Sequence, residues 1–324
     1  MPDINGDVQD RLLDALRNHI LCGDKNVRVY QSEDRSLDLI ASAAEKARDV
    51  TSALTRRYPY SLTQDGLADV EPNQPEVVAT VNTDGVLYVV FASNKEISIR
   101  HEIDRELVAR ALKAGNDELA ETLRQSHEIL AISIERRHAF DVVAVHKNFN
   151  FIEVRVDTFA NEERSLRVHE INDAHHRIIQ KFTEITDRPY LKRQMNLYPS
   201  IRNLLKIDDG NDGAKVRITK FGYVGSSGIA RDERKPHGDV RSDPTHRAAY
   251  QANGADDESI TPYDLEAQFP GVTIIGQPDI VLALHGTEAI GRSAHPVLDE
   301  LTISKCIYES EFSKIMGAVY ERIV

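Results

Sequence analysis

The sequence predicts an α+β fold in which antiparallel β-hairpins are flanked by helices. Segments rich in β-branched and aromatic residues occur as neighbouring pairs joined by short polar turns. Segments with helical periodicity lie in pairs between these hairpins, rather than one after every strand as in an α/β fold. The chain of 324 residues is long enough for two domains of ordinary size. We therefore expect two lobes, residues 1–135 and residues 136–324.

In the N-terminal lobe, apolar residues that recur every three or four positions predict helices at residues 7–20, 36–58, 104–114 and 117–130. Pro59 ends the second helix, and Gly115-Asn116 separates the last two. Strands are predicted at residues 77–81, 86–91 and 96–100. Asp84-Gly85 supplies the tight turn of the hairpin between the first two strands.

The C-terminal lobe is expected to begin with a second hairpin and to end with an amphipathic helix that carries Phe312, Ile315 and Val319 on one side. Strands are predicted at residues 141–146, 151–157, 215–224, 272–275 and 280–284. Helices are predicted at residues 165–185 and 190–205, separated at Arg188-Pro189 because the residue before proline resists the helical conformation. A long polar loop is expected over residues 225–261, with one short helix near residues 244–251.

Charge is distributed unevenly along the chain. The formal net charge is −12, which by itself argues against nonspecific binding to nucleic acid. Counted by segment, residues 1–130 carry −8, residues 131–254 carry +4, and residues 255–324 carry −8. The middle segment also holds seven of the twelve histidines. We therefore expect any anionic ligand to bind to the middle segment.

The cysteine content and the absence of targeting signals indicate a soluble, cytoplasmic protein. Cys22 and Cys306 are the only cysteines, too few for a disulfide framework or a four-thiolate zinc site. The first residues are acidic and polar, unlike a secretory signal. The apolar runs are far shorter than the ~20 residues that a membrane helix needs. No membrane partner is expected.

The predicted hairpin at residues 141–157 carries three charged candidates for catalysis, Asp141, Glu153 and Arg155. An aspartate on one strand followed by Glu-x-Arg on the next resembles the acidic hairpin of PD-(D/E)xK nucleases. The resemblance implies that Asp141 and Glu153 bind Mg²⁺ through oxygen, in a restriction or antiviral-defence setting. Arg155 stands where that family has lysine, and a guanidinium does not readily exchange protons. The alternative is a structural hairpin in which Glu153 pairs with Arg155 or another arginine.

The polar loop that follows the predicted strand at residues 215–224 carries groups suited to an anion. Glycines allow backbone N–H groups to turn toward phosphate, and hydroxyl and guanidinium groups can then bind it. The Gly-Lys-Ser/Thr ending of a P-loop is missing. The candidate ligand-binding residues are Ser226, Ser227, Arg231, Arg234, Lys235, His237, Arg241, His246 and Arg247.

The sequence favours a polyanion-binding protein, with nucleic acid (DNA included) or a nucleotide held by residues 164–247 and no recognisable catalytic motif or cofactor. A metal-dependent nuclease is the first alternative, and it alone calls for Mg²⁺. A subunit of a larger complex, whose acidic ends contact a basic protein partner, is the second.

Overall fold

The computed structural model describes residues 6–32, 36–83, 85–102, 106, 110, 130–158, 164–206, 216–252, 260–271, 276 and 278–321. The strands are β1 (Lys25–Gln31), β2 (Glu76–Thr83), β3 (Val86–Glu102), β4 (Leu130–His146), β5 (Phe151–Asp157), β6 (Arg193–Gln194), β7 (Arg217–Val224), β8 (Ala230–Arg234), β9 (Thr261–Phe269), β10 (Ile280–His285) and β11 (Leu301–Ser304). The helices are α1 (Gly6–Cys22), α2 (Leu37–Ala47), α3 (Ala53–Arg57), α4 (Gln64–Ala68), α7 (Arg164–Thr186), α8 (Tyr198–Leu205), α9 (Pro244–Ala252), α10 (Glu288–Gly291) and α11 (Glu309–Tyr320), with a 3-10 turn, η1, at Val240–Ser242.

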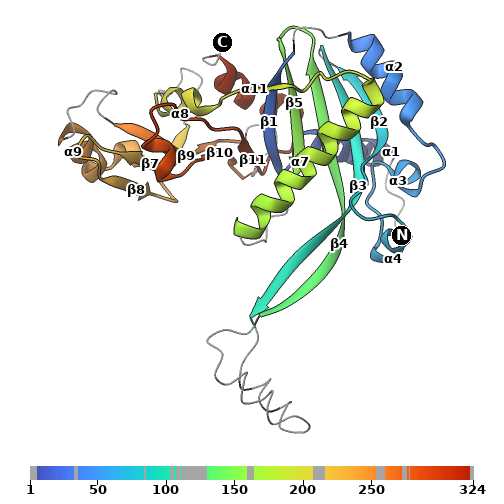
Figure 1. Ribbon diagram of the computed structural model, residues 1–324, viewed down its shortest axis with the longest axis horizontal. Coiled ribbons are helices and arrows are strands. Elements are labelled where there is room, and N and C mark those ends of the chain that lie inside the picture. Colours follow the sequence, from blue (N-terminus) through green and yellow to red (C-terminus); the bar gives the residue numbers. More distant parts are fainter. Residues whose placement is uncertain are drawn as a thin grey trace.

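The strands form one eleven-stranded antiparallel sheet with helices packed on it, and this confirms the predicted α+β class (Figure 1). The strand order is β2-β3-β4-β5-β1-β11-β10-β9-β7-β8, with β6 paired to β1 beside this path. The boundary expected after residue 135 lies within β4. The division into two lobes stays a prediction.

The two predicted hairpins of the first half form the sheet β2-β3-β4-β5. The strand expected at residues 96–100 is the continuation of β3, which pairs with β4 from Val86 opposite His146 to Glu102 opposite Leu130. This ladder extends beyond the body of the protein as a two-stranded arm (Figure 1). The helices expected at residues 104–114 and 117–130 fall almost wholly outside the described residues.

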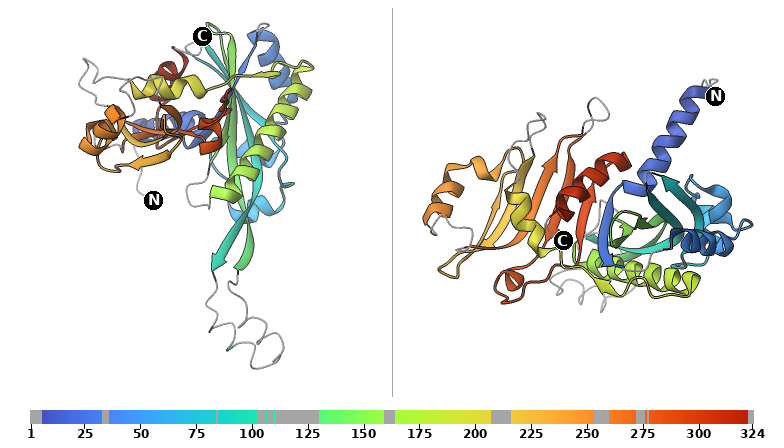
Figure 2. Two further views of the ribbon diagram at one scale, coloured as in Figure 1. Left: turned by 60° about the vertical axis from the view of Figure 1, so that its left-hand side comes forward. Right: turned by 90° about the horizontal axis from the view of Figure 1, so that it is seen from above.

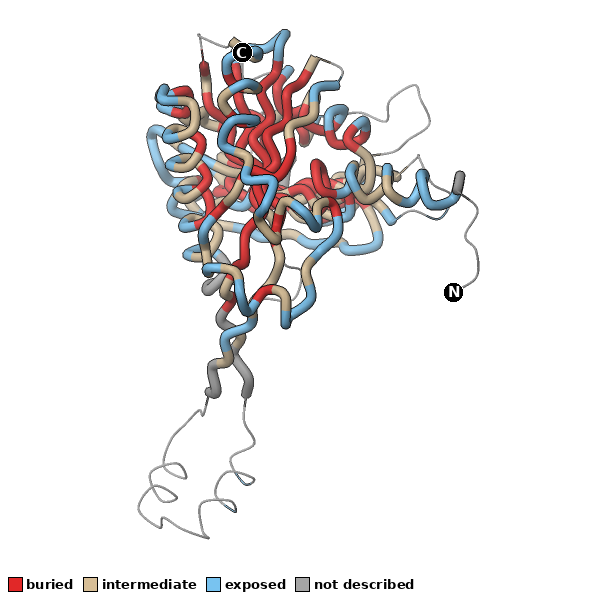
Figure 3. The backbone as a smooth tube through the Cα atoms, turned by 90° about the vertical axis from the view of Figure 1, so that its right-hand side faces the viewer, coloured by how far each residue is buried: buried red, intermediate tan, exposed pale blue. Residues whose placement is uncertain are grey.

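Side chains that alternate along β4 and β5 point to two different apolar layers. On one face Val143, Val154 and Val156 pack against Ile178 and Phe182 of α7, and α2 covers the same face. On the opposite face, α1 and α11 lie against the sheet. Figure 3 shows the strands between these layers buried over much of their length.

The second half of the sheet packs on α8 and α11 around a core that includes Leu282, Ile303 and Phe312. This core is continuous with Val27 and Val29 of β1, so it spans the junction between β1 and β11. The first turns of α1 project away from the body (Figure 2).

Two helices differ from the prediction. The helix expected over residues 36–58 is divided into α2 and α3, and only the last eight residues of the one expected over residues 190–205 are helical. In the non-helical segment before α8, β6 pairs with β1, and Met195 N donates to Val29 O at 2.8 Å. These backbone groups therefore bond to the sheet instead of to a helical turn.

The C-terminal elements contain more regular structure than the sequence indicated. The long polar loop holds β8, η1 and the expected short helix, α9. Strand β9 was not predicted, and the strand expected at residues 272–275 lies outside the described residues. None of the helices in the described part of the chain combines the length and the apolar character that a membrane span requires.

Candidate functional site

The hairpin β4–β5 does not bring Asp141 and Glu153 together. Glu153 lies opposite Ala144, so the odd offset from Ala144 to Asp141 places the two carboxylates on opposite faces of the sheet. Asp141 accepts hydrogen bonds from Lys95 Nζ at 2.8 Å and from Asp157 N at 2.9 Å. In this geometry the two carboxylates cannot bind the same metal ion. Among the described residues no group of three acidic, histidine or cysteine side chains is arranged for a metal.

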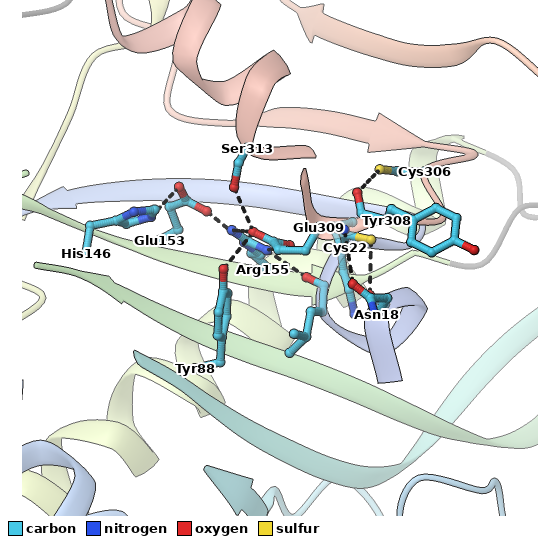
Figure 4. A network of polar contacts seen from close by, with 12 residues as sticks. Asn18, Cys22, Tyr88, His146, Glu153, Arg155, Cys306, Tyr308, Glu309 and Ser313 are labelled. Atoms are coloured by element: carbon cyan, nitrogen blue, oxygen red, sulfur yellow. Dashed lines mark hydrogen bonds and ion pairs between the residues drawn. The ribbon is translucent and has the colours of Figure 1, made fainter. Parts of the chain in front are cut away.

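Glu153 and Arg155 instead form a buried ion pair, as the structural alternative expects. Arg155 Nε donates to Glu153 Oε2 at 2.7 Å, and both side chains have no exposed surface. Arg155 also donates to Glu309 Oε2 at 2.7 Å and to Leu21 O at 2.8 Å, and its guanidinium lies 3.9 Å from the centre of the Phe312 ring. Figure 4 shows Arg155 between the two carboxylates.

Further polar side chains complete the network around these carboxylates. Glu153 Oε1 lies 2.8 Å from His146 Nε2 and accepts from Tyr320 OH at 2.6 Å. Tyr88 OH donates to Glu309 Oε1 at 2.8 Å (Figure 4). Burial and then the adjacent Glu309 raise the pKa of Tyr88, and burial and then Glu153 raise that of Tyr320. Both hydroxyls therefore stay protonated and donate their hydrogen bonds.

The pKa of Glu153 is held well below its usual range. Burial alone would raise it, but the charge of Arg155 and the hydrogen bonds from His146 and Tyr320 outweigh this effect. The carboxylate is therefore ionised at neutral pH, and Arg155, His146 and Tyr320 engage both of its oxygens. We assign the Glu153–Arg155 pair a structural role on these grounds.

A cavity of about 910 Å³ lies in front of this network. Its walls come from α1, the strands β2 and β3, the turn between β4 and β5, and α11. Tyr88, His146 and Tyr320 of the network reach its inner end, and Phe149 and Phe151 line its side. It has the size of a small-molecule site.

Several predicted anion-binding residues of the polar loop are engaged within the protein. Arg241 binds Asp239 at 2.6 Å and the carbonyls of Val216 and Leu205. His246 is buried and bonds to Glu233. These contacts hold η1 and α9 against the sheet, and they occupy hydrogen-bonding capacity that an anion would need.

The other candidates are not gathered at one point. Lys235 forms an ion pair with Asp243 at 3.5 Å. Arg231 and Arg234 lie on the edge strand β8, three residues apart and hence directed to opposite faces. The remaining candidates lie at exposed or half-exposed positions, namely Ser226, Ser227, His237 and Arg247. Whether any of them binds an anion stays a prediction.

A more basic site lies elsewhere in the middle segment. Arg188, Lys192 and Arg193 surround a pocket of about 370 Å³ together with Gln31 and Ser32. The three cationic residues are exposed. Gln31 and Arg193 also line an adjoining pocket of about 730 Å³, so the two pockets form one groove at the end of β1.

The second pocket of this groove is lined by amides and aromatic rings. Its amide side chains are Gln31, Asn148, Asn150, Gln194 and Asn196. Phe149 is 52% exposed and stacks on Phe151 with the ring centres 5.1 Å apart. None of the described residues that line either pocket is acidic, although the chain as a whole carries −12. We call the two pockets together the basic groove.

The sequence reasoning missed the basic groove because its residues come from three separate segments, near Gln31, Phe149 and Arg193. Two features of the sequence pointed toward it. One is the net positive charge of residues 131–254, and the other is the break between two predicted helices at Arg188-Pro189. No protein-family model matches the sequence, and no curated protein matches it. The geometry of the described residues is therefore the basis for the functional argument.

Proposed function

We propose that the protein binds nucleotides, free or within single-stranded nucleic acid, in the basic groove. The observation that carries the proposal is the composition of its walls. Three cationic side chains surround the first pocket, amides and an exposed phenylalanine line the second, and none of the described lining residues is a carboxylate. This keeps the polyanion and the region expected from the sequence, residues 164–247, but draws the contacts from residues 188–196 instead of the candidate residues at 226–247.

Each part of the groove suits one part of a nucleotide. Arg188, Lys192 and Arg193 offer positive charge and hydrogen-bond donors to phosphate. The ring of Phe149 offers a stacking surface for a base, and stacking tolerates any base. The amide of Asn148 can donate to and accept from the edge of a base. Asn196 instead shapes the wall, because its amide donates to Pro296 O and accepts from Tyr198 N and Leu298 N.

A single strand fits this arrangement better than a duplex. In a duplex the base faces are stacked on one another and are not accessible to Phe149, whereas unpaired bases can turn toward an aromatic side chain. The groove lies at the end of β1 and beside the turn that precedes β5. The second pocket has the volume of a small-molecule site, and so holds only a short stretch of strand.

The test is fluorescence anisotropy with labelled single-stranded DNA and RNA oligonucleotides at low salt. The variant Lys192→Glu with Arg193→Glu should weaken binding at least tenfold, because two attractive charges become repulsive. The matched control, Arg231→Glu with Arg234→Glu, makes the same change in net charge on β8 and should bind within twofold of wild type.

Two outcomes would contradict the proposal. A flat titration with every oligonucleotide and mononucleotide would exclude nucleotide binding. A loss of affinity in the β8 variant alone would indicate that the ligand binds to the polar loop at residues 225–261.

A further inference from the structure

We infer that the 910 Å³ cavity between α1 and α11 is a second binding site, which takes an apolar organic cation such as an aromatic quaternary ammonium. The inference does not rest on the proposed function, although Phe149 and Phe151 line both this cavity and the basic groove. It rests on the shape of the cavity, its aromatic walls, its charge, and one glycine of α11.

Aromatic rings form part of the cavity wall. Five rings line it, those of Tyr58, Tyr88, Phe149, Phe151 and Tyr320. The face of an aromatic ring carries partial negative charge and attracts a cation. Arg155 already uses this interaction behind the wall, where its guanidinium lies over Phe312 at 3.9 Å and over Tyr88 at 5.5 Å.

The charges at the cavity favour a cation over an anion. The described lining residues include three carboxylates, Asp14, Glu309 and Glu321, and one guanidinium, Arg17. Arg17 lies 3.6 Å from Asp14 and balances it. Behind the wall, Arg155 pairs with both Glu153 and Glu309 and offsets only one of these two negative charges. With Glu321 this leaves two negative charges in excess, and they would repel an anionic ligand.

The glycine at position 317 keeps the cavity open. Gly317 lies in the interior of α11, where alanine is the better helix former. A Cβ atom at this position would meet no atom within 4 Å, so packing does not require glycine. Gly317 lines the cavity, and any longer side chain would extend into it. The chain thus forgoes helix stability at a wall position where a longer side chain would extend into the cavity.

The test is isothermal titration calorimetry with benzyltrimethylammonium, compared with the anion benzylsulfonate and the neutral N-benzylacetamide. The cation should bind at least tenfold more tightly than either comparison compound. Gly317→Leu should weaken binding strongly because the leucine side chain extends into the cavity beside the ligand, whereas Gly317→Ala adds a single methyl group and should retain it. Glu321→Gln should weaken binding severalfold, since it removes an excess carboxylate at an exposed position.

Melting temperatures verify that the variants fold, and Gly317→Ala should melt above wild type. Absence of binding by all three compounds would overturn the inference. So would equal affinity for the cation and the neutral compound, preference for the anion, or unchanged affinity in a folded Gly317→Leu variant.

Discussion

Arg155 Nε lies 2.7 Å from Glu153 Oε2, with both side chains completely shielded from solvent. The second carboxylate of Arg155, Glu309, begins α11. One guanidinium therefore ties β5 to a helix that the chain reaches more than a hundred residues later. Its neighbours Tyr88 and His146 open onto the large cavity, so the ion pair also fixes the inner wall of that site.

Arg155→Met should destabilise the fold strongly. The substitution leaves Glu153 and Glu309 buried without their cation, and breaking a buried pair in this way costs about 3–5 kcal/mol. The free energy of unfolding in urea measures the loss. Arg137→Ala is the matched control, because Arg137 pairs with Glu135 at the surface, where an ion pair contributes about 1 kcal/mol or less. Equal losses in the two variants would contradict the structural role of Arg155.

The stability of the protein should fall as the pH drops from about 6.5 to about 4, in part because of His138. Burial lowers the pKa of His138 to about 4, and Asp157 only partly offsets this. His138 Nδ1 accepts a hydrogen bond from Leu62 N at 2.9 Å, which requires the neutral ring. In this pH range the unfolded chain binds a proton that the folded protein excludes, so stability rises with pH there and falls as acid is added.

His138→Asn isolates this contribution, since its amide oxygen keeps an acceptor for Leu62 N without titrating. The loss of unfolding free energy between pH 7 and pH 4 should become smaller, by at most about 3 kcal/mol, because one pKa unit corresponds to about 1.4 kcal/mol. His169→Asn, on the exposed side of α7, should keep the wild-type loss. An unchanged pH dependence in His138→Asn would show that this histidine is not responsible.

The affinity for single-stranded nucleic acid should decrease with salt. Each phosphate contact contributes a slope of about −0.7 in log K against log salt on a single strand. Lys192→Ala with Arg193→Ala removes two contacts and should make the slope shallower by about 1.4. Arg231→Ala with Arg234→Ala should leave both the slope and the melting temperature unchanged, because exposed side chains alter stability by under ~0.5 kcal/mol. A wild-type slope in the first variant would place the phosphate contacts elsewhere.

Phe149→Ala should weaken oligonucleotide binding by about 1–3 kcal/mol, the contribution of one stacked base. The melting temperature should change little, since Phe149 is 52% exposed. Phe149→Trp should retain affinity because it preserves a stacking surface. An abasic oligonucleotide of the same length provides the control, since it keeps the phosphates and lacks the base. If Phe149→Ala weakened the abasic and normal strands equally, stacking would not be the reason.

Addition of Mg²⁺ or Mn²⁺ should not elicit cleavage of nucleic acid, because Asp141 and Glu153 point to opposite faces of the sheet. Gel electrophoresis of labelled DNA and RNA, with and without the metal, is the measurement. Metal-dependent cleavage that disappears in Glu153→Gln would support the nuclease alternative instead.

Sequence periodicity predicted the elements whose geometry is set locally. The helices at residues 7–20 and 165–185 and both hairpins are found with small changes in their ends. The segment near Arg193 has helical periodicity as well, yet it pairs with β1 because the tertiary structure offers its backbone groups a strand to bond with. Strand β9 has a similar explanation, since it is fixed by β7 and β10 on its two sides.

The candidate sites could be predicted only in part. Glu153 and Arg155 are two residues apart on one strand, so their pairing follows from alternation. Glu309 joins them from 154 residues away in the sequence, and no local pattern indicates that contact. The basic groove is similar, because Phe149 and Arg193 come together only through β1. Arg241 was predicted to bind a ligand because of its residue type. The residue type alone does not show that the guanidinium of Arg241 is already paired with Asp239.

The narrow junction of the sheet has a consequence for how the protein is made. Only three residue pairs join β1 to β11, and they link residues 25–27 to residues 301–303. While the ribosome is still producing the second half, β1 can pair with β5 but has an open edge, and Val27 and Val29 lack the core they later enter. During the same interval Arg155 lacks Glu309. The nascent chain therefore carries an exposed strand edge at residues 25–27 and an incompletely compensated guanidinium until α11 emerges.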